Sequence, residues 1–189
     1  MHFWPRLMHR IDFLVESVLS WDERTMVAIS DNTVLRRFNR TLVTATYLGD
    51  GYLWGLLALI LILFGSTTDR FNVLIGLGVS IVNISIFRFI KLLFSRERPE
   101  GLGLSLRSRI IDSYSFPSGH AATSFGMAWV VAQCYPVLWV QVAIYMVAAM
   151  ISLSRIYVRE HYPLDVMVGA TLGSIVAMYV YPFFHWLVF

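Results

Sequence analysis

Long apolar runs cover most of the chain after residue 41 and dictate its architecture. A helix needs about 20 residues to cross a hydrocarbon core of about 30 Å, and five runs are close to that length or longer. They are residues 42–64, 71–94, 118–135, 137–153 and 164–189. Unpaired backbone N–H and C=O groups are costly in lipid, so runs of this length predict helices. The strands of a membrane barrel would be shorter and would alternate apolar with polar residues.

The first 40 residues show a different, amphipathic pattern. Apolar residues recur at helical spacing along one face, first in residues 11–19 and again in residues 34–42. The members of the first stripe are Ile11, Leu14, Val15, Val18 and Leu19. The pattern predicts helices that lie on the membrane surface over residues 1–40. The alternative is that one of them forms a short sixth span.

Composition supports a membrane protein. The 189 residues are 57% hydrophobic and 14% charged, with a mean hydropathy of +0.64. Soluble domains average about 45–50% apolar and about 25% charged residues. These values exclude a disordered chain, a disulfide-rich secreted scaffold and an ordinary soluble enzyme. The sequence therefore predicts an all-α integral membrane bundle of five transmembrane helices, or six under the alternative above. We expect one domain, residues 1–189, with the bundle over residues 42–189.

Alternating spans bring three distant segments to one face of the membrane: residues 1–41, 95–117 and 154–163. The polar residues that gather there are Lys91, Arg98, Ser118, His120, Arg155, His161 and Asp165. Cations, two histidines and an acid at one rim of a membrane protein favour an anion site.

These residue types suit a phosphate dianion. Lys91, Arg98 and Arg155 can neutralise it, and arginine offers planar, bidentate contacts. Ser118 and Gly119 open a predicted helix, whose free N–H groups bind anions, and Gly119 lets the backbone approach a ligand.

Two histidines and an acid add the means for catalysis. His161 and Asp165 are four residues apart, so on a helical turn the carboxylate can orient the imidazole. An oriented His161 can act as a nucleophile, and His120 can be the acid for the leaving group. Taken singly, each residue also has a structural reading, as a helix cap, a lipid-headgroup contact or a buried pair. Taken together at one rim, they favour catalysis.

No metal, cofactor or nucleic acid is expected. The sequence has no HExxH motif and no set of cysteine ligands, and two histidines alone are a weak zinc signal. The positive charge lies against the membrane, which argues against a nucleic-acid partner.

Three motifs resemble a known family. Residues 91–99 fit K-x6-R-P, residues 117–120 read P-S-G-H, and residues 154–165 fit S-R-x5-H-x3-D. In this order they resemble the type 2 phosphatidic acid phosphatase superfamily, which includes vanadium haloperoxidases and glucose-6-phosphatase. Residues 49–51, Gly-Asp-Gly, also look like a family feature. Many bacterial membrane members have six spans, and this chain has no run that matches the first.

The resemblance implies a metal-independent phosphatase that forms a phosphohistidine. His161 would attack phosphorus, Asp165 would orient it and His120 would protonate the leaving oxygen. The phosphoryl oxygens would be held by Lys91, Arg98, Ser118, Gly119 and Arg155. Expected substrates are membrane lipids such as phosphatidylglycerophosphate, phosphatidic acid, undecaprenyl pyrophosphate or a lipid A phosphate. The alternatives are a lipid phosphotransferase with the same site and a non-enzymatic phospholipid-binding or transport protein.

The predicted location is the inner membrane, with several spans. The family default in bacteria puts the site on the periplasmic face, whereas 13 of the 15 Lys and Arg residues lie on the site's face. The positive-inside rule therefore favours a cytoplasmic site. An anion-binding face is basic for its own reasons, which weakens this argument. The choice of lipid is expected to rest on the loop of residues 95–116 and on the N-terminal helices.

Overall fold

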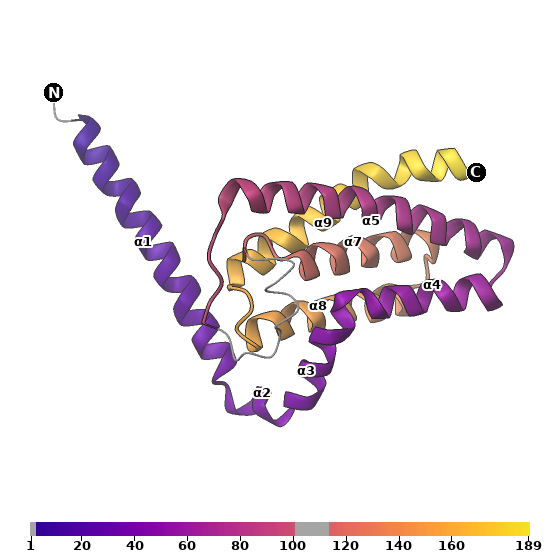
Figure 1. The fold of residues 1–189 in the computed structure, drawn as a ribbon, viewed down its shortest axis with the longest axis horizontal. Coiled ribbons are helices and arrows are strands. Elements are labelled where there is room, and N and C mark those ends of the chain that lie inside the picture. Colours follow the sequence, from indigo (N-terminus) through magenta and orange to yellow (C-terminus); the bar gives the residue numbers. More distant parts are fainter. Residues whose placement is uncertain (1–2, 101–113) are drawn as a thin grey trace.

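The computed structural model describes residues 3–100 and 114–189, which are helical with no strand in these two ranges (Figure 1). The helices are α1 (Phe3–Ser30), α2 (Thr33–Arg37), α3 (Asn39–Tyr47), the π-helical turn η1 (Leu48–Tyr52), α4 (Leu53–Phe64), α5 (Thr67–Phe94), α7 (Gly119–Cys134), α8 (Leu138–Tyr157) and α9 (Pro163–Val188). The predicted all-α fold is confirmed.

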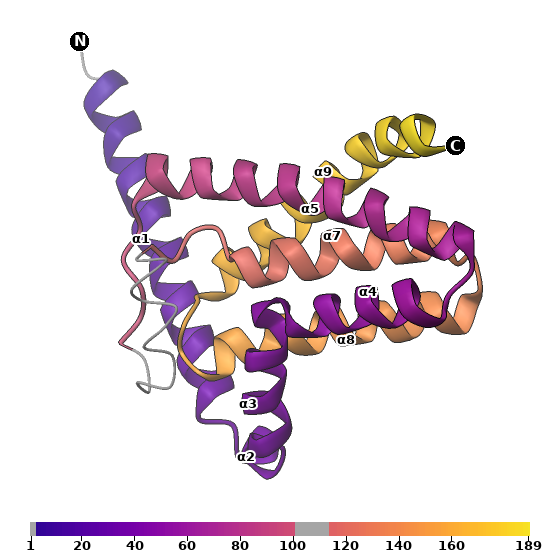
Figure 2. The same ribbon diagram turned by 45° about the vertical axis from the view of Figure 1, so that its right-hand side comes forward.

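Helix α7 is the centre of the bundle. It packs against α5, α8 and α9 and lies between its neighbours in both views (Figures 1 and 2). Small residues allow this close packing, as the Gly169-x3-Gly173-x3-Ala177 spacing predicts. A Cβ at Gly173 would run into the backbone carbonyl of Ala122, and one at Gly169 into the backbone of Ser118. The first turn of α7 is thereby held against the first turns of α9.

Four of the five predicted spans are long and apolar enough to cross a membrane, judged over the described residues. They are Asn39–Phe64, Thr67–Phe94, Leu138–Tyr157 and Pro163–Val188. The third predicted span is α7, whose 16 residues reach only about 24 Å at about 1.5 Å per residue. Because its neighbours enclose α7, its ends need not match the thickness of the bilayer. The chain is a multi-pass membrane protein.

The first span bends at η1, where Gly51 has a φ of 104°. Glycine adopts this left-handed conformation at no steric cost. The bend joins α3, which packs on α8, to the more exposed helix α4. It also turns Asp50 toward the start of α7.

The N-terminal segment forms one long helix, α1, that crosses the end of the bundle at a steep angle (Figures 1 and 2). Its apolar stripe, residues 11–19, is exposed, as expected for a helix that lies on a membrane surface. The side that packs on the bundle instead carries Asp22, Met26 and Ser30. Helix α3 already belongs to the first span, so the surface segment ends at about residue 38.

Replacing Gly173 with alanine is expected to destabilise the protein by about 1–3 kcal/mol or more, because the added methyl overpacks the α7–α9 contact. The thermal unfolding midpoint in detergent measures the loss. Gly55→Ala is the matched control, since a Cβ at Gly55 meets no atom within 4 Å. Equal midpoints for the two variants would contradict this account of the packing.

Candidate functional site

The eight site residues expected from the sequence gather at one end of the bundle. There α5 and α8 end and α7 and α9 begin, and the C-terminal half of α1 crosses this end (Figure 2). The sequence-based grouping of three distant segments therefore matches the structure.

His161 lies in the tight connection between α8 and α9. The carbonyl oxygen of Arg155 accepts the backbone N–H groups of Glu160 (3.0 Å) and His161 (3.3 Å). Arg159 takes a φ of 56° to close this turn. The His161 side chain is 1% exposed, and its Nδ1 lies 3.7 Å from Oδ2 of Asp165. This distance is longer than a hydrogen bond, as is often the case for catalytic contacts when no substrate is bound.

Asp165 is held from several sides. Its Oδ1 accepts a 2.7 Å bond from Nη1 of Arg96, and its Oδ2 accepts the N–H of Tyr162 at 2.9 Å. Its backbone carbonyl accepts the N–H of Ser118 at 2.9 Å. Asp165 therefore joins the first turn of α9 to the residue that caps α7.

Besides Asp165, buried cations and a second buried acid, Glu160, lie around His161. Nη1 of Arg98 lies 2.7 Å from Oε2 of Glu160, and Nη2 of Arg155 lies 3.8 Å from the same oxygen. Lys91 is 4% exposed, and its Nζ donates to the carbonyl oxygen of Tyr114 at 2.8 Å. Burial, and then the positive charges of Arg155, Arg98 and Lys91, hold the pKa of His161 well below its ordinary value of 6.5. His161 is therefore neutral at pH 7, as a nucleophile must be.

His120 stands in the first turn of α7 and contacts the η1 bend. Its Nε2 lies 2.7 Å from Oδ1 of Asp50. A Cβ at Gly49 would lie 2.8 Å from Cδ2 of His120, so the glycine allows this approach. Gly119 also allows close packing, because the ring of Phe87 occupies the space that a Cβ at this position would need.

Sequence reasoning missed three contributors: Asp22, Arg96 and Glu160. Arg96 and Glu160 fall on variable positions of the motifs, and Asp22 lies in the segment assigned to the membrane surface. The only feature of the sequence that pointed to these residues was the presence of further charged residues within or near the motifs. Asp50 stands in the Gly-Asp-Gly segment, for which the sequence indicated no chemical role. Arg88, which precedes Lys91 by three residues on α5, is exposed. Residues 101–113, in the loop expected to select the lipid, lie outside the described residues.

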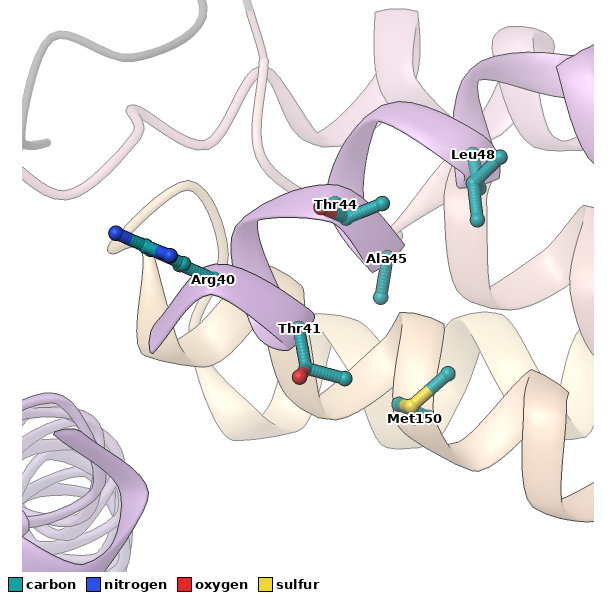
Figure 3. Close-up of a pocket in the computed structure, with 6 residues that line it drawn as sticks. All are labelled: Arg40, Thr41, Thr44, Ala45, Leu48 and Met150. Atoms are coloured by element: carbon teal, nitrogen blue, oxygen red, sulfur yellow. The ribbon is translucent and has the colours of Figure 1, made fainter. Parts of the chain in front are cut away.

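Among the described residues, no group of three or more His, Cys, Asp or Glu side chains is placed to hold a metal ion. A hollow of about 340 Å³ lies on the outer side of α3 and α8, between Arg40 and Leu48 and beside Met150 (Figure 3). None of the eight site residues lines it. The candidate functional site is therefore the side-chain cluster around His161 and not this hollow.

The family model of the PAP2 superfamily matches residues 71–189. The chain belongs to the PAP2 superfamily. This confirms the resemblance carried by the three motifs, all of which fall inside the matched range.

Relatives of the chain include proteins named as an undecaprenyl-diphosphatase and a lipid A phosphatase. YbjG of Escherichia coli is 32% identical over 123 residues, 64% of this chain and 61% of that protein. The lipid A 4'-phosphatase of Bacteroides thetaiotaomicron is 30% identical over 109 residues, 54% of this chain and 48% of that protein. The chain thus matches about half to three-fifths of the length of these relatives.

The solved structure of a transmembrane PAP2-type phosphatidylglycerolphosphate phosphatase from Bacillus subtilis has the same fold. It superposes with a TM-score of 0.68, covering 97% of this chain and 96% of that one, at 23% identity. The helical arrangement is therefore shared along nearly the whole chain.

The depressed pKa of His161 makes folding stability depend on pH. In the unfolded chain this histidine takes up a proton near pH 6.5, whereas in the folded protein it stays neutral to lower pH. Its contribution to stability is therefore fully present above about pH 6.5 and is lost as the pH falls toward the folded pKa. We expect the unfolding midpoint in detergent to fall less between about pH 7 and pH 5 in His161→Gln than in the wild type. Parallel pH curves for the two proteins would contradict this.

Proposed function

We propose that the protein hydrolyses the phosphate monoester or pyrophosphate of a membrane lipid through a phosphohistidine on His161, without a metal. The observation that carries this proposal is the convergence of three distant motifs on one buried histidine. Asp165 faces one ring nitrogen of His161, and three cations surround the imidazole. A protein that only bound or carried lipid would need the cations but not the oriented histidine.

The geometry suggests how the transfer proceeds. Nδ1 of His161 faces Asp165, so Nε2 is the nitrogen that attacks phosphorus. The N–P bond forms as the P–O bond to the lipid breaks, and the leaving oxygen takes a proton from His120, which enters this step as the imidazolium paired with the Asp50 carboxylate. Water, deprotonated by His120, then attacks the phosphohistidine, which releases phosphate and restores neutral His161.

The remaining site residues suit charge stabilisation. Lys91, Arg98 and Arg155 would hold the phosphoryl oxygens, together with the backbone at Ser118 and Gly119, where α7 begins. Asp50 would orient His120 from the other side of its ring. Glu160 neutralises part of the cationic cluster, so an incoming phosphate competes with it for Arg98 and Arg155.

A lipid substrate fits the location of the site. The cluster lies at the end of a transmembrane bundle, at the level where phospholipid headgroups meet water. A lipid phosphate reaches this position while its hydrocarbon chains remain in the bilayer. The substrates named for the relatives, including lipid A phosphate, belong to this class.

Phosphate release from a panel of lipid phosphates and pyrophosphates in detergent, with excess EDTA, tests the proposal. We expect release by the wild type and a loss of about a thousandfold or more in His161→Ala, since the nucleophile is gone. His185→Ala is the matched control, because His185 is exposed near the far end of α9 and should leave the rate unchanged.

Two results would overturn the proposal. Release that EDTA abolishes would show that the site works through a metal. No release from any lipid by folded wild type would favour a phosphotransferase that lacks its acceptor, or a binding protein.

We propose further that the protein lies in the inner membrane with its site facing the cytoplasm, as the excess of Lys and Arg on the site's face favours. Helix α9 starts at the site and ends at the opposite end of the bundle (Figure 1). A reporter active only in the cytoplasm, fused to the C-terminus, should therefore be silent, and an active fusion would refute this orientation.

A further inference from the structure

Two side chains outside the proposed reaction form a bridge that ends on Asp165. Arg96 donates from Nη1 to Oδ1 of Asp165 and from Nη2 to Oδ2 of Asp22, each over 2.7 Å. Both carboxylates are fully buried, and the side chain of Arg96 is 21% exposed. A planar guanidinium that binds two carboxylates at once holds both at a defined angle.

Asp22 comes from α1, far from the motifs in sequence. Its second oxygen, Oδ1, accepts the N–H of Leu164 at 2.8 Å. Leu164 precedes Asp165 in the first turn of α9. Asp22 therefore holds both the guanidinium that contacts Asp165 and the backbone beside it.

Arg96 has little freedom to move elsewhere. Its guanidinium carbon lies 4.1 Å from the centroid of the Tyr162 ring, and its backbone carbonyl accepts the N–H of Ser115 at 2.8 Å. Arg98 and Arg155 pair with Glu160, whereas Arg96 pairs with Asp22 and Asp165, so Arg96 belongs to a separate group of charges.

We propose that Arg96, held by Asp22 of α1, is a positioning residue that fixes the orientation and the effective charge of Asp165 toward His161. The inference rests on the function proposed above. When His161 takes the phosphoryl group its ring becomes cationic, and a negative Asp165 stabilises that charge. Arg96 alone would neutralise Asp165. The carboxylate of Asp22 brings the net charge of Asp22, Arg96 and Asp165 together to −1. His161 therefore keeps a negatively charged partner.

A double-mutant cycle on the turnover of a lipid phosphate tests the bridge. Asp22→Asn and Arg96→Gln should each lower kcat by about 10- to 100-fold with KM little changed, less than the loss expected for a residue that contacts the nucleophile directly. Asp22→Asn keeps a side-chain oxygen that can accept the Leu164 N–H and loses only the ion pair with Arg96, so the double variant should be no slower than Arg96→Gln alone. Arg96→Lys keeps the positive charge but loses the planar guanidinium that binds two carboxylates at once, so its kcat should also be low.

Asp31→Asn is the matched control, because Asp31 also ties the end of α1 to the bundle, through Arg159 at 3.2 Å, without touching Asp165. It should leave kcat within about twofold of the wild type. The unfolding midpoint of each variant distinguishes slow turnover from loss of the folded protein. If Asp22→Asn does not fold, the kcat of Arg96→Lys tests the bridge in its place.

The outcomes separate the two proposals. No turnover by the wild type counts against the proposed function. Turnover that is lost in His161→Ala but unchanged in Asp22→Asn refutes the bridge alone. Multiplicative losses in the double variant, or a kcat that falls only with the folded fraction, would show that the bridge merely docks α1.

Discussion

The structure at the site end depends on the mutual compensation of buried charges. An ion buried without a partner costs several kcal/mol, so each charge here must be met by one from another segment. Arg96 joins Asp22 to Asp165, and Glu160 lies between Arg98 and Arg155. The cations come from the end of α5, the segment after it and the end of α8, and the acids come from α1, the α8–α9 connection and the first turn of α9. The site is therefore complete only when all of these segments are in place.

Close helix packing provides the rigid frame for these charges. Where Gly169 and Gly173 face α7, two backbones approach without intervening side chains, and the N–H of Ser118 bonds directly to the carbonyl of Asp165. This contact fixes the start of α7 relative to the start of α9. The proposed acid His120 and the proposed nucleophile His161 stand next to these two starts, so their relative placement follows from the packing of the helices.

Helix α1 reverses the usual arrangement of an amphipathic helix. In a soluble protein the apolar stripe packs on the core, but here the stripe of residues 11–19 is exposed and the packed side carries Asp22. An exposed apolar stripe of this kind is what a helix on a membrane surface presents to lipid. One helix thereby carries an exposed apolar side and, along another side, the acid that contacts the charged site.

Local patterns in the sequence determined the helical membrane fold and the eight candidate site residues. Apolar runs, small residues four apart, the helix start at Ser118 and the four-residue spacing of His161 and Asp165 all act over a few turns, so they can be read without a structure. The partners that hold those residues were decided only by tertiary structure. Asp50 meets His120 across 70 positions, Arg96 meets Asp22 across 74, and Asp22 binds Leu164 across 142. No local spacing encodes such pairs, because they form only when packing brings distant helices together and burial requires each charge to find a partner.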